Sequence, residues 1–184
     1  SLVGSEMCIR DRGVSIVREP EQAEKMLNDG LVDLIAMGRS WLADPQWGIK
    51  AIEGRDADIT RCIGCMYCFE ALFSGGHVEC AVNPRCGFES EFPIEPERNA
   101  EGRTALVIGG GPAGCEAAET LAKRGAKVTL VESEETLGGQ VVPGTNPPGK
   151  DPMGWLVENY ERRLEQAGVE VRLSTRFGAE EVRE

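Results

Sequence analysis

The segment TALVIGGGPAGCEAAETLAKRGAKVTLVE, residues 104–132, most constrains what this chain can fold into. An apolar run ends in three glycines, an alanine-rich stretch follows, and Gly125 separates that stretch from a second apolar run ending in Glu132. This pattern predicts a strand, a tight turn, a helix and a second strand. Because strands joined through a helix are usually parallel, the segment predicts an α/β fold.

The glycines of the turn follow the spacing Gly109-x-Gly111-x-x-Gly114. Gly109 allows a tight turn, Gly111 lets the backbone approach a pyrophosphate, and Gly114 lets helix and strand pack closely. Glu132 ends the second strand and is expected to accept hydrogen bonds from an adenosine ribose. An acid there favours a ribose without a 2′-phosphate, as in FAD or NAD. The alternative is a glycine-rich turn that binds no ligand.

The residues that follow extend the same pattern. A Gly- and Pro-rich loop over 138–149 leads to an amphipathic helix predicted over 151–168 and an alternating strand over 169–174. The order βαβαβ is typical of the first half of a doubly wound sheet. The predicted inner face of the helix over 151–168 consists of Trp155, Leu156, Tyr160, Leu164 and Ala167.

Four cysteines lie within the nineteen residues of CIGCMYCFEALFSGGHVEC, residues 62–80. A [4Fe–4S] cluster takes four cysteine thiolates, often as a compact triplet and a distant fourth, and this spacing favours it. A zinc site usually has two separated C-x-x-C pairs, and the second pair is absent here. Zinc and a disulfide with free thiols remain the alternatives. The four candidate ligands are Cys62, Cys65, Cys68 and Cys80, whereas Cys86 and Cys115 are expected to be structural and His77 a loop residue.

An earlier part of the chain resembles the end of an α/β barrel. Residues 19–30 predict a helix, 31–38 a buried parallel strand and 44–54 a second helix. Gly38 and Arg39 directly follow that strand. In a TIM barrel the loops after the last strands commonly bind phosphate, and a glycine amide beside a guanidinium suits that role.

Composition excludes several classes of partner. The 184 residues carry a formal net charge of -11, which argues against nucleic acid or an anionic membrane surface as a partner. The longest apolar runs are too short to span a bilayer, and we find no secretory signal. A cytoplasmic location follows as an expectation, and clustered cysteines in such a reducing compartment bind metal more often than they form disulfides.

The chain divides into five predicted segments. Residues 1–12 resemble the translation of a sequencing adapter and are set apart from fold reasoning as an artefact. The other segments are a barrel end over 13–58, a cluster-binding segment over 59–88, a linker over 89–102 and the first half of an FAD/NAD(P)-binding domain over 103–184. The chain is therefore expected to be an internal fragment of a longer protein.

Three motifs in this order resemble one family: DLIAMGRSWLADPQW, then CIGCMYC…CAVNP, then ALVIGGGPAGCEAA…VTLVE…LGGQ. The chain is similar, over about residues 14–184, to the NADH:flavin oxidoreductases of the old-yellow-enzyme-like iron–sulfur flavoprotein group. That group includes 2,4-dienoyl-CoA reductase, 2-enoate reductases and trimethylamine dehydrogenase. The resemblance implies the C-terminal end of a TIM barrel, a cysteine-rich cluster-binding segment and a partial doubly wound, Rossmann-like domain.

The resemblance also implies cofactors and their ligands. It places FMN in the barrel, a [4Fe–4S] cluster on the four cysteines, and FAD with NAD(P)H in the C-terminal region. In this reading Gly38 and Arg39 touch the FMN phosphate. The dinucleotide residues implied are Gly109, Gly111, Pro112, Ala113, Gly114, Glu132, Gly139 and Gln140, with Gly138 in the same LGGQ loop.

The implied reaction carries electrons from NAD(P)H through FAD and the cluster to FMN, which reduces an activated C=C bond of a small-molecule substrate. The catalytic residues belong to barrel strands outside this chain, so the fragment alone is expected to be inactive. The x2–x2 cysteine spacing is nearer the amine-dehydrogenase type, in which ADP can replace FAD. A non-catalytic electron-transfer module and a zinc-stabilised nucleotide-binding domain are further alternatives, and a homo-oligomer of the full-length protein stays open.

Overall fold

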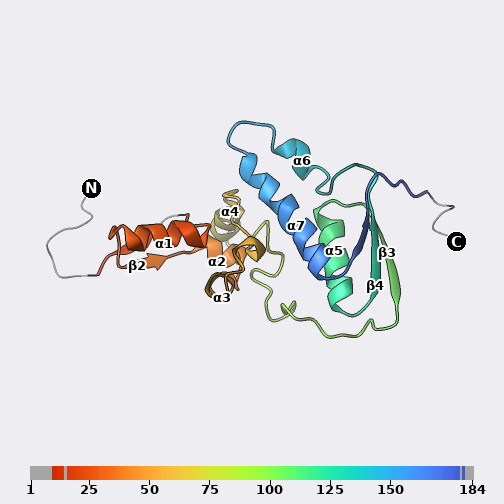
Figure 1. The fold of residues 1–184 in the computed structure, drawn as a ribbon, viewed down its shortest axis with the longest axis horizontal. Helices are drawn as coiled ribbons and strands as arrows, with labels where there is room; N and C mark the ends of the chain where they lie inside the picture. The colour runs from red at the N-terminus through yellow and green to blue at the C-terminus, as the bar shows by residue number, and fades with distance from the viewer. Residues whose placement is uncertain (1–9, 15, 179, 181–184) are drawn as a thin grey trace. The chain divides into compact units, whose positions relative to one another are not determined.

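The chain divides into two units between Phe88 and Glu89. The structure is a computed structural model that describes residues 10–14, 16–178 and 180. Residues 1–9, most of the predicted adapter segment, lie outside the described residues. The boundary between the units falls where the predicted cysteine segment ends. Each unit has its own parallel sheet (Figure 1).

The first unit contains the predicted helix and strand together with a strand that the sequence pattern did not indicate. The predicted strand is exposed to half-buried here, and not buried as expected. Strands β1 (Arg12–Val14) and β2 (Leu34–Ala36) pair in parallel and are joined through helix α1 (Pro20–Asn28). Pro20 begins α1, and the chain leaves the helix through Gly30 in a left-handed conformation, at φ +65°. Val17, Ala23, Trp47 and Ile59 form the buried core of this unit, and Met26, Ile35, Met37 and Ala51 pack against it.

Short helices connect this small sheet to the cysteine segment. Helix α2 (Arg39–Ala43) follows β2 at once, and α3 (Trp47–Ile52) and the 3₁₀ turn η1 (Asp56–Asp58) come next. Helix α4 (Tyr67–Phe73) lies inside the cysteine segment. The sequence pattern indicated neither α2 nor α4, because neither segment shows a sustained helical period between clear start and stop residues.

The second unit contains the predicted βαβαβ order. Strands β3 (Thr104–Ile108), β4 (Lys127–Val131) and β5 (Glu170–Arg172) form a parallel sheet in the order β3-β4-β5. Helix α5 (Pro112–Lys123) connects β3 to β4. The loop after β4 contains α6 (Val141–Gly144) and the turn η2 (Asp151–Met153), and α7 (Gly154–Gln166) leads to β5.

Helices α5 and α7 pack side by side against one face of this sheet (Figure 1). Leu130, Cys115, Ala118 and Leu164 are fully buried there. Leu156, Tyr160 and Leu164 confirm most of the predicted inner face of α7, whereas Trp155 and Ala167 are only half-buried. Among the described residues, no helix is long and apolar enough to cross a bilayer.

Candidate functional site

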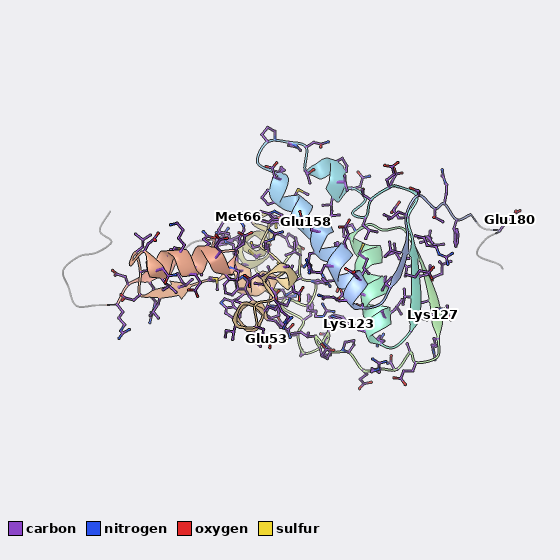
Figure 2. The ribbon with its side chains drawn as sticks, in the orientation of Figure 1. Glu53, Met66, Lys123, Lys127, Glu158 and Glu180 are labelled. Atoms are coloured by element: carbon purple, nitrogen blue, oxygen red, sulfur yellow. The ribbon has the colours of Figure 1, made fainter. Side chains whose placement is uncertain are left out.

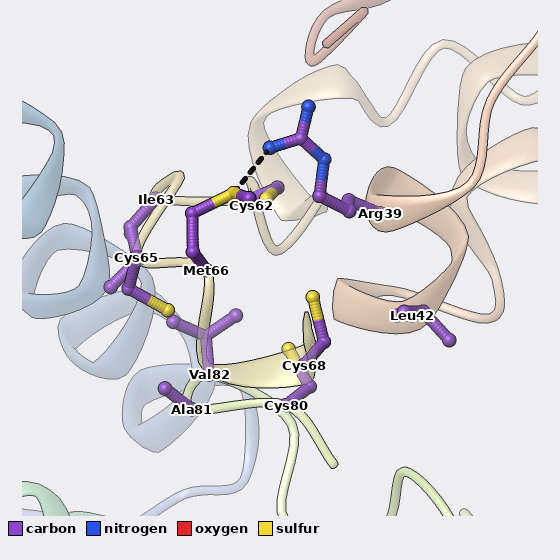
Figure 3. A pocket seen from close by; sticks show the side chains of 10 residues that line it. All are labelled: Arg39, Leu42, Cys62, Ile63, Cys65, Met66, Cys68, Cys80, Ala81 and Val82. Carbon is purple, nitrogen blue, oxygen red and sulfur yellow. Dashed lines mark hydrogen bonds between the residues drawn. The ribbon is translucent and has the colours of Figure 1, made fainter. Parts of the chain in front are cut away.

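All four predicted ligand cysteines line one small pocket in the first unit (Figure 3). Cys62 is buried, Cys68 and Cys80 are half-buried, and Cys65 is exposed. All four are thiols outside any disulfide. The remaining wall is mostly apolar and consists of Arg39, Leu42, Ile63, Met66, Ala81 and Val82.

Two left-handed residues alternate with the cysteines of the triplet and turn it around the pocket. Gly64 has φ +73° and Met66 has φ +65°. Glycine adopts this conformation without strain, whereas for methionine it costs about 1 kcal/mol or more. Cys80 lines the same pocket, and the chain turns directly after it, with an isolated bridge between Cys80 and Asn83. Residues 62–68 and residue 80 therefore meet despite their separation along the chain.

Polar contacts from the barrel-like part hold the cysteine segment in place. Arg18 Nε donates to the backbone carbonyl of Cys62 at 2.7 Å. Asn83 Nδ2 donates to the carbonyl of Leu42 at 2.8 Å. The sequence analysis missed both residues, because an arginine after a strand and an asparagine in a loop show no pattern that points to a site.

The donor set of this pocket suits an iron–sulfur group. Four thiols with apolar neighbours match the all-cysteine ligation of [4Fe–4S] clusters. Burial raises the pKa of the Cys80 thiol to about 11, partly offset by hydrogen bonds from the backbone of Val82 and Asn83. In the described part of the chain, no three His, Cys, Asp or Glu side chains are placed to hold a metal ion, so the four cysteines share a pocket without forming a preformed metal site. The observation that supports an iron–sulfur site is that all four cysteines line one pocket.

Arg39 lies at this pocket, and Gly38 caps the N-terminus of α2. Arg39 Nη1 donates to Met66 Sδ at 3.2 Å, the contact drawn in Figure 3, and its guanidinium lies 5.9 Å from the centre of the Phe69 ring. Both residues were predicted to touch an FMN phosphate, and that role stays a prediction. Cys86 is buried outside the pocket, and His77 is an exposed loop residue as expected.

The backbone of the glycine turn in the second unit requires glycine at two of the predicted positions. Gly109 has φ +102°, so the turn uses a conformation that favours glycine. A Cβ on Gly114 would lie 1.9 Å from the carbonyl oxygen of Gly109, so this position allows no side chain. Gly111 caps α5 and has no atom within 4 Å of where its Cβ would be. Pro112 and Ala113 begin the twelve-residue helix α5, whose first amides are unpaired within the helix and attract an anion.

Glu132 lies at the end of β4, beside this turn, and is buried. Its carboxylate accepts hydrogen bonds from the amides of Gly110 at 2.6 Å and Glu134 at 3.0 Å, and from the Ser133 hydroxyl at 3.0 Å. The two amides, that of Glu134 first, lower the pKa of Glu132. The carboxylate is therefore ionised at neutral pH and suited to accept ribose hydroxyls.

The LGGQ loop folds back over the glycine turn. Gly138 N donates to the carbonyl of Gly110 at 2.8 Å, and a Cβ on Gly139 would lie 3.3 Å from Gly111 Cα. Gln140 is exposed. Cys115, expected to be structural, is fully buried, and its thiol donates to the same Gly110 carbonyl at 3.2 Å. The glycines of the turn and of the LGGQ loop, together with Glu132, are therefore brought together around one turn.

Comparisons with known proteins show which proteins this chain is similar to. Residues 105–177 match the family described as "FAD dependent oxidoreductase". The "NADH oxidase" of Thermoanaerobacter brockii is 41% identical over 171 residues, 92% of this chain and 26% of that protein. The "Cinnamate reductase" of Clostridium sporogenes is 38% identical over 169 residues, 91% of this chain and 25% of that protein.

The chain is also similar to a solved structure. The 6-hydroxypseudooxynicotine amine oxidase of Pseudomonas geniculata N1 has a TM-score of 0.89 at 32% identity, covering 95% of this chain and 27% of that one. The chain thus spans about a quarter of the length of the relatives it matches.

These similarities define a class of protein, the FAD-dependent oxidoreductases. Within this class the chain belongs to the family of iron–sulfur flavoproteins that includes 2,4-dienoyl-CoA reductase and trimethylamine dehydrogenase. Its fold class is the predicted one, α/β with the end of a TIM barrel followed by part of a Rossmann-like domain.

Proposed function

We propose that this chain is part of a reductase that uses NAD(P)H, FAD, a [4Fe–4S] cluster and FMN to reduce an activated C=C bond of an enoate or dienoyl-CoA type. The observation that carries the proposal is the meeting of the four cysteines in one pocket. Similarity to a cinnamate reductase and to a 2-naphthoyl-CoA reductase supports the substrate class. When bound, the cluster would supply one-electron transfer between the two flavins.

The residues of the first unit would hold and shield the cluster. Cys62, Cys65, Cys68 and Cys80 would ligate iron as thiolates, so loading the site displaces their protons. Leu42 and Val82 form apolar parts of the wall and exclude water from it. Arg18 fixes the backbone of the first ligand through its bond to the Cys62 carbonyl.

The residues of the second unit would bind the ADP half of FAD. Gly111 leaves open space at the N-terminus of α5, where unpaired amides attract a pyrophosphate. Glu132 would accept the ribose hydroxyls. For that step its carboxylate gives up part of its present bonding to the amides of Gly110 and Glu134.

An amine-dehydrogenase-type member of the family is the second candidate. The observations that favour it are the cysteine spacing and the 34% identity of this chain to the solved histamine dehydrogenase of Rhizobium sp. 4-9, at a TM-score of 0.88. The non-catalytic electron-transfer module and the zinc-stabilised domain remain further alternatives.

Cofactor analysis of the full-length protein tests the proposal. We expect about four iron and four acid-labile sulfide per chain, with both FAD and FMN, and NADH- or NADPH-dependent reduction of cinnamate. Oxidation of an amine without enoate reduction would favour the second candidate. Zinc without sulfide in the folded protein would contradict both.

A further inference from the structure

Arg39 brings a positive charge to the edge of the cysteine pocket. Its side chain is half-buried and forms part of the pocket wall. Its two contacts are the thioether of Met66, at 3.2 Å, and the face of the Phe69 ring, 5.9 Å from the guanidinium carbon. Among the residues that the structure describes, no carboxylate pairs with Arg39.

A thioether is a weak hydrogen-bond acceptor, and an aromatic ring attracts a cation without neutralising it. Among the described residues, no side-chain anion therefore offsets the charge of Arg39 at the pocket. Arg61, one residue before Cys62, differs in this respect, because its guanidinium pairs with the Glu19 carboxylate at 3.0 Å. Arg61 is also absent from the pocket wall.

Arg39 also contacts the strained point of the cysteine triplet. Met66 lies between Cys65 and Cys68 in a left-handed conformation, at φ +65°. A strained residue of this kind persists only where its surroundings hold it. The bond to Met66 Sδ and the contact with Phe69 on α4 attach both sides of the triplet's turn to Arg39 on α2.

We propose that Arg39 is a positioning residue of the cluster loop and that its charge raises the reduction potential of the cluster. This inference rests on the proposed function. A group held by four thiolates is anionic and gains one further negative charge when it takes up an electron. A nearby guanidinium therefore stabilises the reduced state more than the oxidised state. The proposal concerns the cluster alone and adds a second task to the predicted FMN-phosphate contact.

The test is an EPR-monitored redox titration of the cluster in the full-length protein. At the midpoint potential of the wild type, Arg39→Gln should shift the ratio of reduced to oxidised cluster about tenfold towards the oxidised form. For a one-electron couple this shift corresponds to about 59 mV. Arg39→Lys keeps the charge and should stay near the wild type. Arg61→Gln removes the same charge outside the pocket wall and is the matched control with a smaller expected shift.

An unchanged potential in Arg39→Gln, or an equal shift in Arg61→Gln, would overturn the proposal. If Arg39→Gln fails to retain a cluster, retention in Arg39→Lys supports the proposal, and loss in both variants counts against it, because the fit of the side chain would then matter more than its charge. A wild-type protein without any cluster would instead contradict the proposed function, so the two failures are distinguishable.

Discussion

At the scale of single residues, Gly114 and Gly111 have opposite constraints within one motif. A Cβ on Gly114 would lie 1.9 Å from the Gly109 carbonyl oxygen, whereas a Cβ on Gly111 would meet no atom within 4 Å. Gly111 also has φ −72°, which alanine adopts without strain. Gly114 therefore serves the packing of α5 on β3, and Gly111 leaves space for a ligand.

Substituting each glycine with alanine should separate these two tasks. Gly114→Ala is expected to lower the free energy of unfolding by about 3 kcal/mol, because α5 has to move away from the turn. Gly111→Ala should leave that free energy within about 0.5 kcal/mol of the wild type but weaken FAD binding at least about tenfold. Urea unfolding and a flavin fluorescence titration measure the two effects. Equal destabilisation by both changes would contradict this division of tasks.

Glu132 makes the free energy of unfolding depend on pH. Its folded-state pKa is lowered by the amides of Glu134 and Gly110. The carboxylate therefore contributes stability above its ordinary pKa of about 4.3, and this contribution is lost as the pH falls through the lower folded-state value. We expect the unfolding free energy of the wild type to decline below about pH 4.5 and that of Glu132→Gln to decline less.

The matched control is Glu134→Gln. Glu134 bonds to Glu132 through its backbone amide, and its own side chain is exposed. Its replacement should leave both the acid profile and nucleotide affinity close to those of the wild type, whereas Glu132→Gln should weaken the binding of FAD. Urea denaturation between pH 3 and 7 would show the difference, and parallel profiles for the wild type and Glu132→Gln would argue against this role.

At the scale of elements, a buried ion cluster joins α5 to α7. Arg163 on α7 lies between Glu116, at 2.7 Å, and Glu119 on α5. Lys123, near the end of α5 in Figure 2, adds a 2.9 Å contact to Glu119. Burial opposes ionisation of Glu119, whose side chain is 3% exposed, but Arg163 and Lys123 outweigh it and lower its pKa. The two helices are therefore linked by charge as well as by apolar packing.

Removing Arg163 should leave the Glu119 carboxylate buried with Lys123 as its remaining cation. Arg163→Gln is expected to cost about 3 kcal/mol of unfolding free energy, near the lower end of the range for breaking a buried pair. Arg162→Gln changes the exposed neighbouring residue and should cost less than about 0.5 kcal/mol. Urea denaturation measures the cost of each substitution. Equal costs would show that the ion cluster around Arg163 adds nothing to the packing of α5 against α7.

Elements marked by an apolar pattern and by clear residues at their ends could be predicted from the sequence, whereas β1, α2 and α4 could not. Strands β3 and β4 and helix α5 were predicted from an apolar run, a glycine turn and a helical pattern that support each other. Helix α4 was missed, because it begins directly after a left-handed Met66 and has no common capping residue at its start. The meeting of Cys80 with the triplet was predicted from thiol chemistry, whereas the contacts of Arg18 and Asn83 arise only from tertiary packing.

At the scale of the whole molecule, both units leave apolar surface exposed. Leu106 and Ile108 on β3 are 40% and 55% exposed, and Val14 on β1 is 74% exposed. These exposed apolar side chains suit contact with further strands or helices. The chain spans only about a quarter of the length of its relatives. The proposed FMN site would lie mostly in the length that this chain does not cover.

We therefore expect this chain by itself to reduce no enoate. The experiment is to supply the purified chain with NADH, FAD, FMN and cinnamate under anaerobic conditions and to follow cinnamate consumption. The full-length protein under the same conditions is the control that should be active. Turnover by the chain alone at a rate near that of the full-length protein would show that the described residues already contain a catalytic site.

The central claim is that the pocket lined by Cys62, Cys65, Cys68 and Cys80 holds an iron–sulfur cluster. Anaerobic reconstitution with iron and sulfide, followed by EPR of the dithionite-reduced protein, tests it most directly. We predict a reduced-cluster signal that is lost in Cys80→Ser and kept in Cys86→Ser, because Cys86 is buried outside the pocket. The absence of a signal, with one zinc bound per chain, would contradict the account and would make the pocket a structural metal site.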